Sequence, residues 1–391
     1  MREDLKIING SVRDQRPLGW VCLAGAILFA TVGCSESNQA PEGPSDATVP
    51  VVAAMDHSSP YTSSACSDEF AMKTVCGFRN PEDILPLPGD RHVLISEMGA
   101  FMTDAPGRLS VFDQASELIE PLAMQVAESD RLWGDAACPM PDAALFSPHG
   151  IDLVTDNSDQ LRLLVVNHGG RESVEMFEMT EGASGWQATW RGCALPPGDP
   201  FINDVSGLKD GSFLVTHMWD KHLPFEEVAR KLTSGEFTGW VWRWTEADGF
   251  TKLGGSTELM PNGIVLSADE QFAYVNIYMG NKTIKVDLSA QEKVGEFSVR
   301  QPDNITRDEA GALWVASHQH DPLGQSCDGV EEAACLLPFR VVRVDPDTLE
   351  TEVVVDHSGE PMGYATVATK IGDRLFMGSA HGDRIAIQPL N

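Results

Sequence analysis

The segment RQPDNITRDEAGALWVASHQH, residues 300–320, carries the two features that decide the fold. Its first half places an acidic and an amide side chain, Asp303 and Asn304, directly before an isoleucine. Its second half is a run of β-branched, aromatic and small apolar residues that ends in a histidine, which is typical of a strand. Asp and Asn favour turns, but their oxygens are also ligands for a hard metal ion. The other copies of this pattern are needed to choose between the two roles.

The strand-like run of residues 311–318 recurs along the chain. Each copy starts near a charged residue or a glycine, and the copies lie roughly 40 to 70 residues apart, which fits blade-length units with insertions. The six copies are residues 91–97, 161–168, 211–217, 271–277, 311–318 and 373–381. Further strands follow some of them, at residues 173–179 and 282–288, and the best helical pattern is at residues 224–232.

These units predict an all-β fold, a six-bladed β-propeller over residues 66–391. No linker interrupts this range, which argues against the alternative of several separate β domains. We expect the segment near Glu82 to pair with the C-terminal blade and so close the ring.

Residues 1–33 have the pattern of an export signal of the lipoprotein type. A basic flank precedes an uncharged run at residues 18–32, shorter than the roughly 20 residues that a membrane-spanning helix needs. The run ends in TVGC, which resembles a bacterial lipobox and predicts a lipid anchor on Cys34. We expect an exported protein anchored to the outer membrane or cell surface; ordinary signal cleavage, giving a periplasmic or secreted protein, is the alternative. Residues 34–65 are polar and aperiodic, which predicts a flexible tether.

The charge balance is strongly acidic. Lys and Arg total 28 against 58 Asp and Glu, a formal net charge of −30. Such a surface repels nucleic acid and anionic lipid headgroups and attracts cations. We therefore expect no nucleic-acid partner, and membrane contact only through the anchor at Cys34.

Eight cysteines in an exported chain predict disulfides. Cys327 and Cys335 lie in one acidic loop and are expected to pair. The other expected pairs are Cys66 with Cys76 and Cys138 with Cys193. No CxxC pair has the spacing of a structural zinc site.

Polar side chains precede an isoleucine or valine in several other units, as they do at Asp303. These are Glu82 and Asp83, His149, Asn203 and Asp204, and Asn262. In a propeller the residue that enters an innermost strand points at the central channel, so these groups would meet near one axis. For any single pair a turn is the simpler explanation, and Asn-Gly at residues 262–263 is a standard turn signal. Recurrence at blade spacing instead favours calcium held by oxygen ligands in the channel.

Several short segments taken together resemble the serum paraoxonase family of calcium-dependent lactonases, from about Cys76 to the C-terminus. They are EDILPLPG (82–89), SPHGI (147–151), LLVVNH (163–168), SVEMFE (173–178), ND (203–204), NGIVLS (262–267), DNI (303–305) with LWVASH (313–318), and TVATKIGDRLFMGS (366–379). The resemblance implies a six-bladed propeller with two calcium ions in its channel. The C-terminal IAIQPLN lacks the cysteine of the family's closing disulfide, and THMWDKH (216–222) replaces the family's Asn-Asp-His turn.

Carried over by position, the resemblance also implies the site residues. The catalytic calcium would be bound by Glu82, Asn203, Asn262, Asp303 and Asn304. The deeper, structural calcium would be bound by Asp83, Asp204 and the backbone carbonyl of Ile151. His149 and His168 would be the catalytic histidines.

The function expected from this site is hydrolysis of small-molecule lactones and esters. Calcium would polarise the carbonyl group, and His149 would take a proton from the attacking water, with His168 orienting it or relaying the proton. Either histidine can instead simply cap its strand. Two other functions stay open: a gluconolactonase-type propeller with one metal, and a non-catalytic binding propeller that calcium only stabilises.

Overall fold

The computed structural model describes residues 62–63, 66, 70, 72–99, 105–127, 133–322, 324–327, 330 and 333–390. The expected export signal and Cys34 lie outside these residues. So does the expected tether, apart from Thr62 and Ser63. Within the described ranges, no helix is long and apolar enough to cross a membrane.

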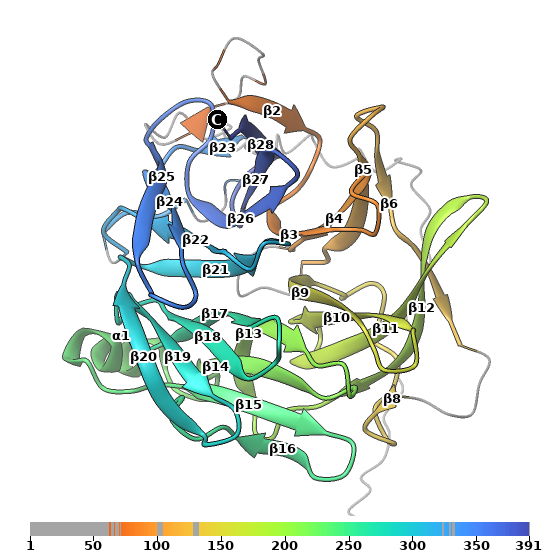
Figure 1. Ribbon diagram of the computed structural model, residues 1–391, viewed down its shortest axis with the longest axis vertical. Coiled ribbons are helices and arrows are strands. Elements are labelled where there is room, and N and C mark those ends of the chain that lie inside the picture. Colours follow the sequence, from red (N-terminus) through yellow and green to blue (C-terminus); the bar gives the residue numbers. More distant parts are fainter. Residues whose placement is uncertain are drawn as a thin grey trace, which may run out of the picture. The chain divides into compact units, whose positions relative to one another are not determined.

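Six sheets surround a central axis and form a β-propeller, as predicted (Figure 1). They are antiparallel except for two added strands in the second blade. Each sheet contributes one innermost strand to the wall of the channel, and these strands pack against one another around the ring. The innermost strands are β3 (Pro81–Pro86), β9 (Pro148–Thr155), β13 (Pro200–Gly207), β17 (Pro261–Leu266), β21 (Pro302–Arg307) and β26 (Ala365–Ile371).

The second strands coincide with the predicted repeats. They are β4 (His92–Glu97), β10 (Leu161–Asn167), β14 (Phe213–Asp220), β18 (Phe272–Ile277), β22 (Leu313–His318) and β27 (Arg374–Ser379). The outer strands are β5 (Arg108–Asp113), β6 (Ile119–Pro121), β11 (Ser173–Gly182), β12 (Gly185–Ala194), β15 (Trp240–Thr245), β16 (Gly249–Lys252), β19 (Lys282–Asp287), β20 (Glu292–Ser298), β24 (Phe339–Val344), β25 (Thr351–His357) and β28 (Arg384–Pro389). Apolar clusters fill the spaces between blades: Ile264 and Val275 of one blade pack with Leu214 and Val241 of the preceding one.

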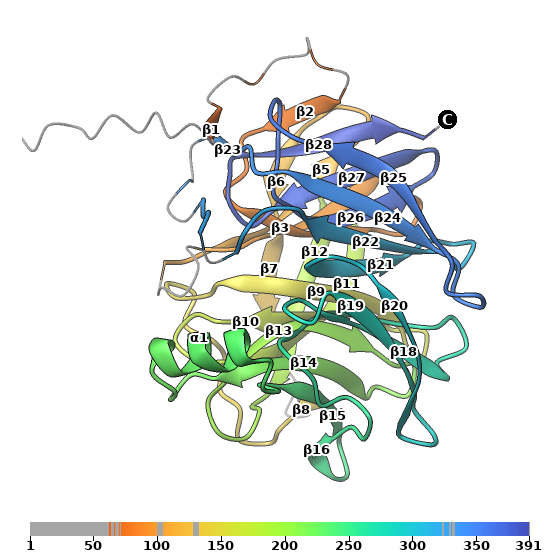
Figure 2. The same ribbon diagram turned by 90° about the vertical axis from the view of Figure 1, so that its left-hand side faces the viewer.

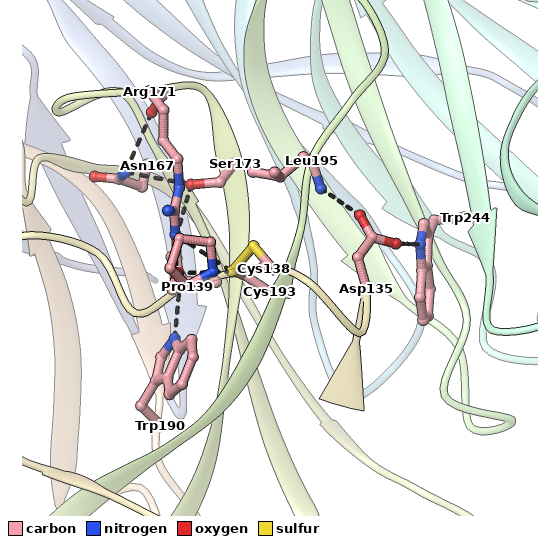
Figure 3. Close-up of a disulfide and its surroundings, with 11 residues drawn as sticks. Asp135, Cys138, Pro139, Asn167, Arg171, Ser173, Trp190, Cys193, Leu195 and Trp244 are labelled. Atoms are coloured by element: carbon pink, nitrogen blue, oxygen red, sulfur yellow. Dashed lines mark hydrogen bonds and ion pairs between the residues drawn. A yellow bond between two sulfur atoms is a disulfide. The ribbon is translucent and has the colours of Figure 1, made fainter. Parts of the chain in front are cut away.

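The second blade is wider than the others. Its strand β12 pairs in parallel with β7 (Ala123–Val126) and β8 (Trp133–Gly134). The disulfide between Cys138 and Cys193 fastens this added segment, and Asp135 accepts hydrogen bonds from the Leu195 amide and the Trp244 indole (Figure 3). The insertion is therefore tied to the blade by covalent and polar contacts as well as by strand pairing.

The ring is closed by β2 (Lys73–Cys76), which pairs antiparallel with β28. The closing strand thus ends before Glu82, which instead opens the first blade and accepts a hydrogen bond from Thr366 on its carbonyl oxygen. The disulfide between Cys66 and Cys76 lies at the end of β2. A third disulfide joins Cys327 to Cys335, next to the pairing of β1 (Thr62–Ser63) with β23 (Ala334–Cys335). All three predicted disulfides are confirmed.

Every innermost strand is irregular at the same level of the channel. Its register with the second strand shifts at the polar positions, for example between Ile202 and Val205 and between Pro302 and Ile305. Such a β-bulge releases its residues from the strict alternation of a strand. Two consecutive side chains can therefore both serve the channel.

The Asn-Gly pair at residues 262–263 lies inside β17, so its interpretation as a turn signal is wrong. A Cβ atom on Gly263 would lie 2.5 Å from the carbonyl oxygen of Asp303 on β21. Glycine is required here because two innermost strands approach each other closely.

One α-helix occurs among the described residues, α1 (Phe225–Ser234), at the predicted position. It follows β14 and lies on the same face of the propeller as β1 and β23 (Figure 2). Val228 of α1 packs against Phe201, Met218 and Trp219. Because the second strands end on this face and the innermost strands begin there, α1 stands at the channel mouth that carries the polar positions.

Candidate metal and catalytic centre

The five residues predicted to bind the catalytic metal come from four innermost strands, and all five are buried. Glu82 lies on β3, Asn203 on β13, Asn262 on β17, and Asp303 and Asn304 on β21. The Asn304 amide donates a 2.7 Å hydrogen bond to Glu82 Oε1, and the Asn262 side chain hydrogen bonds to the Asp303 carboxylate. His149 lies against both the Asn203 carbonyl and the Glu82 carboxylate. The structure thus brings the predicted residues together.

Four oxygens of this group are buried without a hydrogen-bond partner: Glu82 Oε2, Asn203 Oδ1, Asn262 Oδ1 and Asn304 Oδ1. A buried polar atom without a partner costs roughly 1–3 kcal/mol, so four in one place need an explanation. A mixture of carboxylate and amide oxygens is the ligand chemistry that Ca²⁺ accepts. These oxygens therefore fit a hard cation.

The carboxylates of the centre are few. In the described part of the chain, no three His, Cys, Asp or Glu side chains gather closely enough to hold a metal ion by themselves. The mouth of the channel offers Glu82 and Asp303, and the remaining candidate ligands are asparagine amides. A metal here would be held by neutral oxygens as much as by charged ones, which suits calcium better than zinc.

Burial makes the charges of the site costly. It raises the pKa of Glu82 well above the ordinary value, and the charges of Asp83, Asp303 and Asp204 raise it further. Burial also raises the pKa of Asp303 to about 7. Among the described residues, no Lys or Arg forms an ion pair with any of these four carboxylates. A bound cation would remove this cost, because an opposite charge favours the ionised form.

A cavity of about 190 Å³ further down the channel is lined by the three residues predicted for the deeper metal, Asp83, Asp204 and Ile151, together with Asp152, Ser206, Thr306 and Arg307. Burial raises the pKa of Asp83 to about 7. Burial, followed by the charge of Asp83, raises the pKa of Asp204 well above its ordinary value. The two buried carboxylates thus repel each other.

Asp83 and Asp204 also join neighbouring blades. Asp83 accepts 2.8 Å hydrogen bonds from the backbone N–H groups of Ile84 and Ile151. Asp204 accepts hydrogen bonds from the N–H groups of Val205, at 2.8 Å, and Ile264, at 2.7 Å. These carboxylates therefore already have structural partners, whereas the four oxygens named above at the mouth do not. Ile151 thus contacts Asp83 through its N–H group, and the role of its carbonyl oxygen as a metal ligand stays a prediction.

The predicted histidines lie side by side. The rings of His149 and His168 meet edge to face with centroids 4.9 Å apart. His149 Nδ1 is 2.9 Å from the Asn203 carbonyl oxygen and 3.7 Å from Glu82 Oε2. Because a carbonyl oxygen only accepts, Nδ1 carries the proton and Nε2 is left as the base. Burial, with a smaller effect of His168, lowers the pKa of His149 to about 3, which favours the neutral imidazole.

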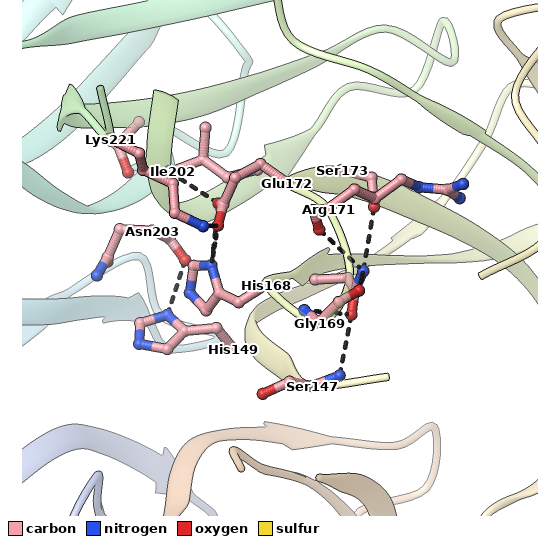
Figure 4. A network of polar contacts seen from close by, with 12 residues as sticks. Ser147, His149, His168, Gly169, Arg171, Glu172, Ser173, Ile202, Asn203 and Lys221 are labelled. Carbon is pink, nitrogen blue, oxygen red and sulfur yellow. Dashed lines mark hydrogen bonds and ion pairs between the residues drawn. The ribbon is translucent and has the colours of Figure 1, made fainter. Parts of the chain in front are cut away.

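Residues that the sequence did not mark complete the wall beside His168. Its ring stacks on Phe201, which stacks on Trp219, with centroids 4.6 Å and 4.9 Å apart. The buried carboxylate of Glu172 contacts His168 Nδ1 and the Lys221 ammonium (Figure 4). The spacing of four residues between His168 and Glu172 is visible in the sequence, but nothing local indicates Lys221.

A third histidine touches the centre from the opposite side. His318 is fully buried, with Nε2 3.4 Å from Asp303 Oδ2 and Nδ1 2.9 Å from the Tyr278 hydroxyl. Burial lowers the pKa of His318 well below its ordinary value. His318 ends the repeated strand of residues 311–318, and the structure puts it against a candidate ligand.

Comparison with known proteins agrees with the resemblance. A family model described as Arylesterase matches residues 79–385. Serum paraoxonase/arylesterase 2 of Rattus norvegicus is 26% identical over 297 residues, which cover 72% of this chain and 77% of that protein. Serum paraoxonase/lactonase 3 of Homo sapiens is 24% identical over 298 residues, with the same coverage. A gluconolactonase structure from Xanthomonas campestris has a TM-score of 0.48 at 18% identity, covering 82% of this chain and 89% of that chain. A TM-score and an identity this low carry no argument about function. The match over most of its length shows that this chain belongs to the arylesterase family.

Proposed function

We propose that this protein is a calcium-dependent hydrolase of lactones and esters. The observation that carries the proposal is the set of four buried, unpartnered oxygens on Glu82, Asn203, Asn262 and Asn304 beside a pair of histidines. Membership of the arylesterase family supports a hydrolase. The names of its relatives, paraoxonase, arylesterase and lactonase, suggest the substrate class.

Two calcium ions are proposed. Glu82, Asn203, Asn262, Asp303 and Asn304 would hold the catalytic ion, and Asp83, Asp204 and the Ile151 carbonyl the structural one. When bound, the catalytic ion would supply a Lewis acid for the substrate carbonyl and for the oxyanion that forms from it.

The protein's own groups would handle the proton. His149 Nε2 is the free nitrogen of an imidazole whose Nδ1–H is held by the Asn203 carbonyl, so Nε2 accepts the proton of an attacking water. As the water oxygen bonds to the carbonyl carbon, the carbonyl electron pair moves onto its oxygen. Collapse of that intermediate breaks the bond to the leaving oxygen, which takes the proton back from the imidazolium. His168, edge to face with His149, lies close enough to stabilise the charge or share the proton.

A lactone and ester panel tests this function. The purified protein is assayed with γ- and δ-lactones, aryl esters and a sugar lactone, before and after removal of calcium with a chelator and its restoration. We expect hydrolysis that is lost with the chelator and regained with calcium, and two ions per chain by mass analysis. Turnover of sugar lactones alone with one metal would identify a gluconolactonase-type enzyme. Stabilisation by calcium without any turnover would identify a binding propeller.

We also propose export with lipid anchoring at Cys34. The three disulfides support an oxidising compartment. Substitution Cys34→Ser is expected to release the protein from membranes, and unchanged partitioning into detergent would contradict the anchor.

A further inference from the structure

The buried carboxylate of Glu172 lies against the ring of His168, the second of the two predicted catalytic histidines. The Glu172 side chain is 2% exposed and collects donors from three places in the chain (Figure 4). His168 Nδ1 is 2.9 Å and 3.1 Å from its two oxygens, Lys221 Nζ is 2.8 Å from Oε1, and the Ile202 N–H is 3.2 Å from Oε2. Glu172 is therefore held in place independently of His168.

These contacts fix the orientation of His168. Its ring is clamped between the Glu172 carboxylate at Nδ1 and the face of Phe201. An ionised carboxylate only accepts hydrogen bonds, so Nδ1 carries the proton and Nε2 is the free acceptor. That Nε2 atom is buried and has no partner among the described residues. A histidine backed by a carboxylate, with its other nitrogen free, has the arrangement of an acid–base residue.

The charge of Glu172 is secured by its neighbours. Burial alone would raise the pKa of Glu172, but the charges and hydrogen bonds of His168 and Lys221 outweigh it, and the pKa lies below the ordinary value. Lys221 is 31% exposed, so its effect is partly screened by water. The charged or titratable groups around this site are His149 on β9, Lys221 after β14 and, at longer range, His217 on β14.

We propose that Glu172 is a positioning residue that fixes the ring of His168 and balances positive charge on it, with Lys221 weakening that effect. The proposal rests on the proposed hydrolase function. In the hydrolytic step the water O–H bond breaks and its proton resides on the imidazole pair until the leaving oxygen takes it back. Glu172 gains no proton; its charge stabilises the imidazolium, as the carboxylate of a catalytic triad does.

Two substitutions should shift the acid limb of the pH profile of kcat in opposite directions. Glu172→Gln keeps the size of the side chain and removes the charge, so the imidazolium loses its partner and the limb should shift to lower pH by roughly one unit or more. The plateau kcat should fall by about 10²-fold or more with little change in KM. Lys221→Met removes the ammonium that neutralises part of the Glu172 charge, so Glu172 stabilises the imidazolium more strongly. The acid limb should therefore shift to higher pH, by a smaller amount.

Glu175→Gln is the matched control. Glu175 is a fully buried carboxylate on β11, three residues after Glu172. It pairs with Arg171 at 2.9 Å and with the Trp190 indole, and among the described residues no hydrogen bond or ion pair joins it to His168. This variant can lose stability, but its acid limb should stay at the wild-type pH. If Glu172→Gln and Lys221→Met both keep the wild-type limb, or shift it in the same direction, the positioning role is overturned while the hydrolase function stands.

A measurement without substrate separates the two proposals. If the wild-type protein hydrolyses no lactone or ester, the proposed function fails, and the imidazole of His168 can still be followed by ¹⁵N NMR in calcium-loaded protein, assigned with His168→Gln. We expect an Nδ1–H tautomer whose titration moves to lower pH in Glu172→Gln and to higher pH in Lys221→Met. The opposite tautomer, or a titration that neither variant moves, would overturn the inference. Should Glu172→Gln fail to fold, Lys221→Met carries the test alone.

Discussion

The side-chain amide of Asn304 donates a 2.7 Å hydrogen bond to Oε1 of Glu82, across 222 positions of the chain. The bond links β21 to β3 at the channel mouth, bypassing β26, which lies between them in the ring. Each residue contributes only one of its two polar side-chain atoms to this hydrogen bond. The other two atoms, Glu82 Oε2 and Asn304 Oδ1, are buried without a hydrogen-bond partner. Two candidate ligands are thus fixed relative to each other before any ion arrives.

Glu82→Gln should abolish most hydrolysis while sparing the fold. Glutamine keeps an oxygen for the Asn304 amide but removes one of two charges from the proposed catalytic ion. We expect kcat/KM to fall on the order of 10²-fold or more, with a nearly unchanged melting temperature at saturating calcium. Glu97→Gln is a suitable control, because Glu97 is equally buried on the same blade but pairs with Arg108 away from the channel. A fully active Glu82→Gln would contradict the lactonase proposal.

Asp83→Asn should act on stability first. Both oxygens of Asp83 accept backbone N–H groups, one of them from the neighbouring blade, and an amide can replace only one of them. If this residue also holds the structural ion, binding energy is folding energy. We expect a lower melting temperature at low calcium that added calcium partly restores, measured by thermal unfolding across a calcium titration. Equal losses of activity and stability in Glu82→Gln and Asp83→Asn would contradict the assignment to two ions.

The calcium-free protein should lose stability as pH rises from about 6.5 to 8. Burial raises the pKa of Asp83 and of Asp303 to about 7, whereas an unfolded aspartate has a pKa of ~3.9. The folded state therefore binds more protons, and the stability this confers in acid disappears as pH passes the folded pKa. Buried histidines, such as His217 with its pKa lowered to about 4, act in the opposite direction below pH ~6.5 and leave this window clear.

Thermal unfolding in chelator at pH 6.5, 7 and 8, beside the same series in saturating calcium, checks this expectation. We expect a fall of a few degrees in chelator alone, since calcium replaces the protons on these carboxylates. A melting temperature in chelator that is constant or rises over this range would show that the carboxylates are ionised without a cation.

Gly263→Ala should destabilise the protein by roughly 1–3 kcal/mol. The added methyl group would meet the Asp303 carbonyl oxygen at 2.5 Å and force β17 away from β21, which carries two candidate ligands. Gly182→Ala is the control, because a Cβ there would meet nothing closer than 3.9 Å. Denaturant unfolding measures both, and calcium affinity should fall in Gly263→Ala alone. Equal stability of the two variants would contradict the close approach of the strands.

The disulfides should differ in what they contribute. The chain-entropy model gives roughly 4 kcal/mol for Cys138–Cys193 and about 2.5 kcal/mol for Cys327–Cys335, because their sequence separations are 55 and 8. Replacing both cysteines of each pair by serine and measuring unfolding in guanidinium tests this order. The reverse order would indicate that local packing, such as that of Arg171 around Cys193, outweighs chain entropy.

The fold could be predicted because its signals are local and repeated. Strands β10 and β22 can each be recognised by a run of mostly apolar residues of about strand length. The polar residues at the start of the innermost strands recur at blade spacing. The proline that opens five of the six innermost strands, as at Pro261 and Pro302, is an equally regular signal that the prediction did not use.

What the sequence did not reveal depends on how distant segments meet. Glu172 shares a loop with His168, but Lys221 follows another strand, and only the packing of two blades brings it to Glu172. The closing strand was expected near Glu82 and is formed by residues 73–76, because Glu82 is required in the channel wall. Gly263 has the sequence of a turn, and its role becomes visible only when β21 is placed beside it.

The pairing of β2 with β28 has a consequence for how the chain acquires its structure. Synthesis runs from the N-terminus, so β2 is made among the first strands and its partner last. Lys73 cannot meet Ile387 until nearly the whole propeller has been made. Until then this pair of strands cannot close the ring. Contacts this remote in sequence are slow to form, because the entropy of so long a loop must be overcome first. Closure of the ring therefore depends on the last strand to be made. A chain that ends before β28 is complete would lose that strand and would also leave β2 without its partner.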